Sequence, residues 1–294
     1  MKFNKQVLDL YKRQFDKIQI IQNMDETEYH ALTALSSGQI KNLLISPKNW
    51  LFQTFEAPEK ETPTLRFGKL FHMAILEPKK FALNAYILPD GDGRSKEVKE
   101  AKANAPSTAI VMSRDEYEQI LAMRKSMFEH PQAKVIFDIP QNQTEVTILF
   151  NANGYAAKTR IDAYEIYEEN GRRKAIAYDL KTTDDISQWG FSKSIADYGY
   201  HIQAAWYCLA LSYALGIDFV DVSFKIIAVK KNGDNDCIRG RLNDASIEVG
   251  FEKIKIALEK FRCFMDDPII ENAVYAKDEV DFGLPAYAFY DHKE

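Results

Sequence analysis

Residues 174–181, which read KAIAYDLK, decide the fold and lead to the candidate site. The stretch is expected to form a β-strand. Residues two apart on a strand project from the same face, so the Asp179 carboxylate and the Lys181 ammonium point the same way. Leu180 then packs on the opposite face. The strand therefore offers a paired acid and base on one side.

A second acid, Asp162, lies on the preceding expected strand, across a hairpin turn at Asn170-Gly171. Alternation puts Lys158, Arg160 and Asp162 on one face of that strand. The other face is expected to hold Ala157, Thr159, Ile161 and Ala163. Two acids and a lysine on neighbouring strands suit metal-assisted phosphodiester hydrolysis. The acids hold Mg²⁺, which offsets charge on the phosphate and activates a water.

Taken alone, the Asp179-Leu180-Lys181 tripeptide is a weak signal. The same spacing of an acid and a lysine recurs at 77–79, 97–99, 100–102 and 291–293. A surface ion pair at a strand end is the structural alternative. None of the other copies falls on an expected core strand behind a second acid-bearing strand.

The remaining sequence predicts an α/β fold with a mixed central β-sheet flanked by helices. Strands are expected at 145–150, 155–167, 174–181, 220–230 and 237–242, with a further hairpin turn at Asn153-Gly154. Helices are expected between Ser36 and Pro47 and at 64–76, 113–130, 201–215 and 244–265. Asp244 is expected to cap the last helix. In the helix at 64–76, Leu65, Leu70, Phe71 and Ile75 are expected to face inward.

Residues 1–28 are expected to form an N-terminal helical arm, and residues 29–294 one domain. Within the domain, residues 89–107 are charged and poor in large apolar side chains. This composition is typical of a mobile segment.

The net charge of −5 and the three cysteines limit the function classes. The charge argues against a protein that coats nucleic acid non-specifically, but it allows an enzyme with basic groups gathered in one channel. The cysteines form no CxxC pair, which excludes a zinc or iron–sulfur site of four cysteines. The N-terminus lacks a signal-peptide pattern, and no stretch is apolar enough to span a bilayer. We expect a cytoplasmic protein with no membrane contact.

Five short motifs follow one another in the order of a known nuclease family. They are Gly68-Lys-Leu-Phe-His72, Glu77-Pro78, Arg160-Ile161-Asp162, Asp179-Leu180-Lys181-Thr-Thr183 and Gln203-Ala-Ala-Trp-Tyr207. The set resembles the exodeoxyribonuclease VIII (RecE-type) family of the PD-(D/E)XK nuclease superfamily, which also includes lambda exonuclease and the RecB nuclease domain. It extends from about Tyr29 to the last helix. Ile161 stands where much of the superfamily has proline, at a position that binds no metal.

The resemblance implies a metal site. Asp162 and Asp179 would bind Mg²⁺, with His72 completing the ligands and Leu180 adding its backbone carbonyl. Glu145 would support a second metal, and Mn²⁺ would substitute because magnesium rarely takes a histidine ligand. Lys181 would position the attacking water or stabilise the phosphate. From the residues alone, a single helical histidine such as His72 is more often a packed or surface residue, and a strand-end glutamate such as Glu145 is usually solvated.

The resemblance also implies contacts with DNA. Gln203 and Tyr207, four apart on a helix, would lie beside the metal site and contact phosphate. Arg160 lies on the face of Asp162, and Ser37 matches an early serine that approaches the 5′ phosphate. Arg94, in the 89–107 segment, would contact the DNA phosphates. The structural alternatives are the edge of an apolar helix face for Tyr207, a helix cap for Ser37 and a solvated loop for Arg94.

Together these features predict a Mg²⁺-dependent, ATP-independent exonuclease on the ends of linear double-stranded DNA, acting 5′ to 3′. The resemblance further implies a homo-oligomeric ring, a single-strand annealing protein as partner, and phage or prophage recombination in a bacterial host cell. Two alternatives stay open. One is a PD-(D/E)XK endonuclease or repair nuclease without end preference. The other is a non-catalytic DNA-binding protein on a nuclease scaffold.

Overall fold

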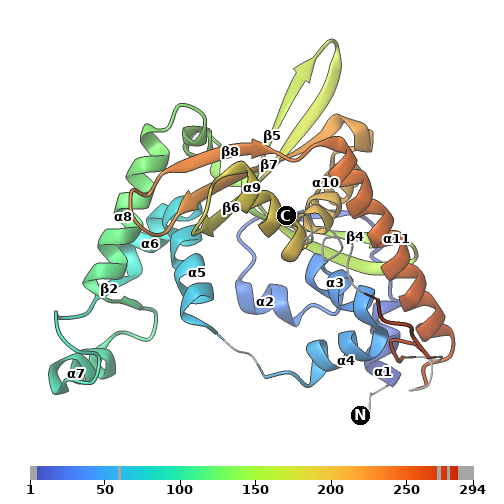
Figure 1. Ribbon diagram of the computed structural model, residues 1–294, viewed down its shortest axis with the longest axis horizontal. Helices are drawn as coiled ribbons and strands as arrows, with labels where there is room; N and C mark the ends of the chain where they lie inside the picture. Colours follow the sequence, from blue (N-terminus) through green and yellow to red (C-terminus); the bar gives the residue numbers. More distant parts are fainter. Residues whose placement is uncertain (1–4, 59–60, 270–272, 277–278, 284–294) are drawn as a thin grey trace, which may run out of the picture.

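The computed structural model of the chain describes residues 5–58, 61–269, 273–276 and 279–283. Its central sheet has the strand order β1-β4-β5-β6-β7-β8. The strands are β1 (Gln19–Ile21), β4 (Thr144–Ala152), β5 (Tyr155–Glu169), β6 (Arg172–Thr183), β7 (Val222–Lys230) and β8 (Cys237–Arg241). Neighbours are antiparallel except β6 and β7, which run parallel. The expected mixed sheet flanked by helices is confirmed (Figure 1).

The two hairpins joining β4, β5 and β6 turn at the expected Asn-Gly pairs. Both residues of each pair have positive φ, 49° and 83° at Asn153-Gly154 and 53° and 71° at Asn170-Gly171. Such turns match the twist of the flanking strands. The second hairpin is longer than predicted, since β5 continues to Glu169, and it projects beyond the body of the protein (Figure 1).

Two helices make the crossover between the parallel strands β6 and β7. These are α9 (Gln188–Asp197), which was not predicted, and α10 (Tyr200–Leu215). Helix α10 is apolar around most of its surface because it lies between the sheet and α11 (Asp244–Asp266). The two helices pack closely at Gly250, where a Cβ would lie 2.1 Å from the His201 carbonyl oxygen. Only glycine permits this approach.

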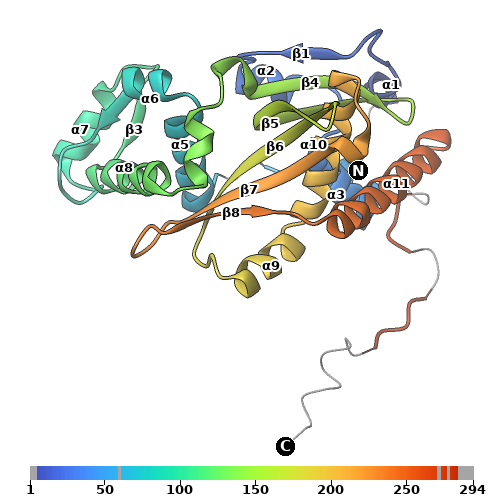
Figure 2. The ribbon, with the colours of Figure 1, turned by 90° about the horizontal axis from the view of Figure 1, so that it is seen from above.

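Helices cover both faces of the sheet (Figure 2). The main core joins the sheet to α10, α11, α1 (Lys5–Tyr11), α3 (Ser37–Ile45) and α4 (Pro47–Phe55). A second core lies on the other face, against α5 (Pro63–Leu76) and α8 (Arg114–Glu129). Strand β6 alternates between them as expected: Ala175 and Ala177 lie in the main core, and Ile176, Tyr178 and Leu180 in the second.

The alternation of β5 breaks at Asp162. Ile161 lies in the main core and Ala163 in the second, although residues two apart normally share a strand face. The expectation that Ala163 shares a face with Ile161 is therefore wrong. The partner strand breaks at the same level, since Glu145, which lies between the Thr144–Ala163 and Val146–Ile161 pairs, has φ 49°. A non-glycine residue in this conformation marks local strain of the kind found at functional sites.

Smaller elements complete the structure. Helix α1 buries Leu8 and Tyr11 in the main core, and β1 forms an edge of the sheet. Residues 89–107 contain α7 (Lys96–Asn104), and their mobility stays a prediction. This segment connects β2 (Ala85–Ile87) to β3 (Ile110–Met112), which pair in parallel. Two further α-helices among the described residues are α2 (Glu26–Ala31) and α6 (Pro78–Asn84). In the part of the chain described, no helix is long and apolar enough to cross a membrane.

The helix expected before Pro47 ends at Ile45, and the helix expected at 64–76 ends at Leu76, as predicted. Pro47 and Pro78 also begin α4 and α6, because proline fits the first turn of a helix. Three other local expectations are wrong. Asn243, not Asp244, caps α11 with its side chain. Leu65 is half exposed rather than inward, and β7 begins at Val222 because residues 219–221 form a 3-10 turn.

Candidate metal and phosphate site

A cavity of about 750 Å³ opens where β4, β5 and β6 meet α5. Helix α2 forms another wall, and the junction of α9 and α10 closes the side beyond the end of β6. The lining includes His72, Glu145, Arg160, Asp162, Leu180 and Lys181. The cavity thus collects candidate residues from four elements that are far apart in the sequence.

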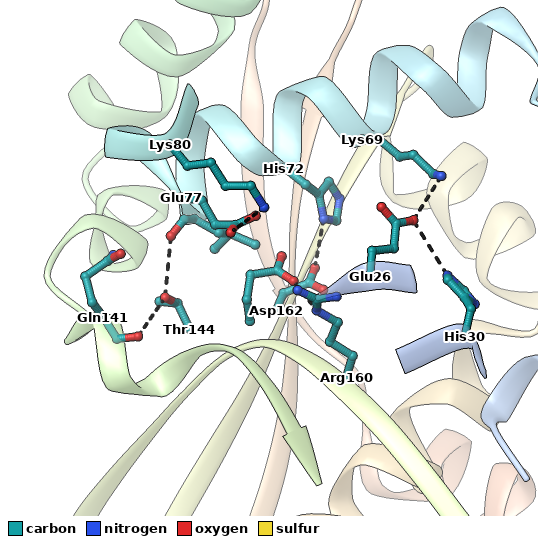
Figure 3. Close-up of polar contacts among 12 residues, drawn as sticks. Glu26, His30, Lys69, His72, Glu77, Lys80, Gln141, Thr144, Arg160 and Asp162 are labelled. Atoms are coloured by element: carbon teal, nitrogen blue, oxygen red, sulfur yellow. Dashed lines mark hydrogen bonds and ion pairs between the residues drawn. The ribbon is translucent and has the colours of Figure 1, made fainter. Parts of the chain in front are cut away.

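His72, Glu145 and Asp162 form a compact group of potential metal ligands. One ligand atom from each lies within 4.8 Å of the others. Asp162 lies at the break in β5, and Glu145 lies at the matching break in β4. The His72 side chain extends from α5 over the sheet (Figure 3). Counted from Val146 and Ile161, which lie in the main core, strand alternation brings both carboxylates to the side on which α5 lies.

Backbone and side-chain contacts hold this group in place. The Leu180 backbone N–H donates to Asp162 Oδ2 at 2.7 Å, which ties β5 to β6. His72 lies between the two strands: its Nε2 is 3.0 Å from the Leu180 carbonyl oxygen and its Nδ1 is 3.5 Å from Asp162 Oδ2. When Nε2 carries the proton, it donates to Leu180, and the Nδ1 lone pair is free to bind a cation.

Asp179 lies deeper than the other acids and is 1% exposed. Its Oδ1 accepts a 2.8 Å hydrogen bond from Gln203 Nε2, which also donates to the Tyr207 hydroxyl at 2.9 Å. Its Oδ2 lies against the Lys181 ammonium as an ion pair but has no aligned hydrogen-bond donor. A buried carboxylate oxygen without a donor can accept a cation.

Burial disfavours the charged forms of two of these acids. It raises the pKa of Glu145 from 4.5 to about 8, and the charge of Asp162 adds to the shift. It also raises the pKa of Asp179 from 3.8 to about 6, although the Lys181 ammonium opposes this. Buried acids with raised pKa values are typical of functional sites, and a bound cation would favour their ionised forms.

The basic side chains that line the cavity are already paired with carboxylates. The pairs are Lys69–Glu26, Lys80–Glu77, Arg160–Glu145, Lys181–Asp179 and Lys231–Asp184. Asp162 and Asp185 also line the cavity. The cavity is therefore not a basic funnel, and a phosphate must compete with carboxylates for these cations.

The other predicted DNA contacts are placed differently. Gln203 and Tyr207 point at Asp179 from α10, so the structure gives Gln203 a role in orienting that acid. Ser37 does not line the cavity, and the helix cap is Ser36, so the capping interpretation of Ser37 is wrong. Arg94 is almost fully exposed beside α7, where it pairs with Asp92.

Two contributors were missed or misread in the sequence. The Tyr200 ring lies 4.8 Å from the Lys181 ammonium, and no motif includes it. Lys158 shares the face of Asp162 as expected, but its buried ammonium donates to the carbonyl oxygens of Tyr29 and Leu32 at 2.7 Å each. It fixes the end of α2, which forms a wall of the cavity.

Comparisons with known proteins agree with this fold. Residues 36–267 match the family described as "PDDEXK-like domain of unknown function (DUF3799)". The fold is similar to that of a crystal structure described as a "Putative exonuclease" from Eubacterium rectale. The TM-score is 0.58 at 10% sequence identity, over 92% of this chain and 99% of that chain. No curated protein has significant sequence similarity to this chain.

Proposed function

Because the chain belongs to the PDDEXK-like family DUF3799, and so to the PD-(D/E)XK nuclease superfamily, we propose that it is a Mg²⁺-dependent nuclease that degrades linear double-stranded DNA from its ends. Within the superfamily, the proposal takes the RecE-type exonucleases as the group whose activity this chain shares. The motif order, from Gly68 to Tyr207, supports that choice.

The observation that carries the proposal is the convergence of acids, histidine and lysine at one cavity. His72, Glu145 and Asp162 lie within ligand distance of one another, and the Asp179–Lys181 pair lies directly behind them on β6. The carboxylate oxygens suit Mg²⁺ or Mn²⁺, whereas the histidine nitrogen is a ligand that magnesium rarely takes. Asp179 Oδ2, which pairs with the Lys181 ammonium and has no aligned hydrogen-bond donor, would offer a further oxygen to a cation.

His72, Glu145, Asp162 and Asp179 would hold the metal, with the Leu180 carbonyl as a further oxygen beside His72. When bound, the cation supplies charge neutralisation at the phosphate and activation of a water. The burial of these acids excludes bulk water from their inner side, which strengthens their attraction for a cation.

Other residues act on the phosphate or on the acids. Lys181 stabilises the negative charge that grows on the phosphate oxygens during attack, an electrostatic role. Gln203 holds Asp179 in the orientation seen here. Arg160 lines the cavity two residues before Asp162 and binds phosphate once Glu145 is neutralised.

The finer features of the proposal rest on the resemblance. They are the 5′ to 3′ direction, the independence of ATP, the approach of Ser37 and Arg94 to DNA, and a role in phage or prophage recombination with a single-strand annealing protein. A closed homo-oligomer belongs to the same group, since a ring would retain DNA that a chain of net charge −5 holds weakly. Light scattering that finds only monomers at micromolar concentration removes the ring.

The experiment compares end-labelled linear duplex with closed circular DNA of the same sequence, each with Mg²⁺ and with EDTA. We expect Mg²⁺-dependent release of nucleotides from the linear form alone. Equal cutting of the closed circle would favour an endonuclease. No cleavage of either substrate with Mg²⁺ or Mn²⁺ would overturn the nuclease proposal.

A further inference from the structure

Two tyrosines form a stacked pair at the lip of the cavity, on the turn between α9 and α10. The rings of Tyr198 and Tyr200 are 5.6 Å apart with an interplanar angle of 29°. Both line the cavity, and Tyr198 is 61% exposed. The exposed ring offers a flat aromatic face on which a planar group can stack.

The turn that carries the pair is constrained by its neighbours. Gly199 has φ 64°, and a Cβ there would lie 2.9 Å from Cδ of Lys41 on α3. The Lys41 ammonium donates to the Tyr198 carbonyl oxygen at 3.1 Å. On its inner side, the Tyr200 ring packs against the buried Phe191 at 6.3 Å. Contacts with neighbouring residues therefore fix the turn and the Tyr200 ring in position.

The tyrosine pair lies directly beside the candidate site. The Lys181 ammonium lies 4.8 Å from the centre of the Tyr200 ring, and Lys181 contacts Asp179. A nucleic-acid strand with a phosphate at Lys181 has to place an adjacent sugar and base beside this lysine. Tyr200 lines the cavity and its ring lies against the Lys181 ammonium, and Tyr198 extends this aromatic surface toward the outside.

We propose that Tyr198 and Tyr200 form a nucleobase-binding subsite, in which one unpaired base next to the reacting phosphate stacks on the exposed Tyr198 ring. The inference rests on the proposed function and deepens it. A base inside a duplex has both faces covered by its neighbours, so a base that stacks on tyrosine comes from a frayed or single-stranded end. Stacking is tolerant of sequence because every base has an aromatic face.

The test measures binding of fluorescent DNA by anisotropy in EDTA, so that the DNA stays intact. Wild type is compared with Tyr198→Ala and Tyr198→Phe on duplexes with a short unpaired end. Loss of one stacked base should weaken binding roughly 5- to 100-fold in Tyr198→Ala, whereas Tyr198→Phe keeps the ring and the affinity. Trp189→Ala is the matched control, because Trp189 is 83% exposed on α9 but does not line the cavity.

A second set of DNAs lacks the base at one position, moved stepwise from the end. At one position, base removal should weaken wild type as much as Tyr198→Ala does, and it should have no further effect on that variant. If Tyr198→Ala weakens binding by the same factor whether or not the DNA has a base at each position tested, the subsite is overturned. Wild-type affinity of Tyr198→Ala for the intact DNA would also overturn it.

The two proposals fail separately. Mg²⁺-dependent degradation of linear duplex together with wild-type binding by Tyr198→Ala would overturn the subsite alone. Base-dependent binding without degradation in Mg²⁺ or Mn²⁺ would support the subsite and overturn the nuclease. A wild type that neither binds DNA in EDTA nor degrades it in Mg²⁺ or Mn²⁺ would overturn both.

Discussion

Glu145 and Arg160 form a 2.7 Å ion pair inside the cavity, at the level where β4 and β5 lose their regular alternation. Glu145 is also within ligand distance of His72 and Asp162. The same carboxylate therefore either binds Arg160 or contributes to a cation site. Metal binding and phosphate binding should be coupled through this residue.

The coupling predicts that Mg²⁺ increases DNA affinity and that part of this increase depends on Arg160. Lys181→Ala keeps the predicted metal ligands and prevents cleavage, so binding can be measured in that background with Mg²⁺ and with EDTA. Adding Arg160→Gln should reduce, by several-fold, the factor by which Mg²⁺ increases DNA affinity. Arg172→Gln is the control, because Arg172 pairs with Asp221 outside the cavity. An unchanged gain after loss of Arg160 would contradict the coupling.

The second prediction concerns the chemistry. Asp179→Asn and Lys181→Ala should each reduce the rate of nucleotide release by about 10³-fold, because each removes an essential group of one site. Circular dichroism should show an intact fold. Lys174→Ala and Glu169→Gln alter an exposed ion pair near the β5–β6 turn and should leave the rate unchanged. Near wild-type rates in Asp179→Asn would place the site elsewhere.

The third prediction concerns pH and the metal-free protein. The pKa of Glu145 is raised from 4.5 to about 8 by burial, so the folded state holds this proton more tightly than the unfolded state. In EDTA, the free energy of unfolding should fall as pH rises from about 4.5 to about 8. Urea denaturation at several pH values between about 4.5 and about 8 measures this change in the free energy of unfolding. Glu145→Gln should flatten the slope, and saturating Mg²⁺ should stabilise wild type more at pH 8 than at pH 6.

Glu169→Gln should keep the wild-type slope, because Glu169 is exposed at the end of β5. A Glu145→Gln slope identical to that of wild type would show that Glu145 is ionised in the metal-free protein throughout the window.

The fourth prediction concerns Gly68, which lines the cavity on α5. A Cβ there would lie 3.9 Å from Thr182 Oγ1, an ordinary contact, so the protein itself does not require glycine. Gly68→Ala should raise stability by about 0.5–1 kcal/mol, as for glycine in a helix interior. It should also raise KM for DNA if the open space serves the substrate.

Gly38→Ala is the matched control for this variant. Gly38 lies in α3 with similar room for a Cβ, 3.8 Å from Ser36 Oγ, and it does not line the cavity. Its KM should be that of wild type. If both variants keep the wild-type KM, Gly68 has no role toward DNA.

The sequence by itself determined the features that depend on local periodicity. The three-stranded meander, its two Asn-Gly turns and the placement of Asp179 and Lys181 on one face of β6 follow from alternation and turn chemistry. The helix before Glu77 and the helix ending at Gly216 follow from the helical period and the stop signals. These signals act between residues close in sequence, so they can be seen without the fold.

Only the tertiary structure decided how the site is assembled. His72 meets Leu180 across 108 residues, and no local pattern encodes that distance. The alternation of the strands breaks at Glu145 and Asp162, and regular strand geometry does not predict such a break. Two of the cavity cations, Lys69 and Arg160, pair with the carboxylates of Glu26 and Glu145 from other elements, because a charge near a low-dielectric interior is stabilised by whichever opposite charge the fold brings near.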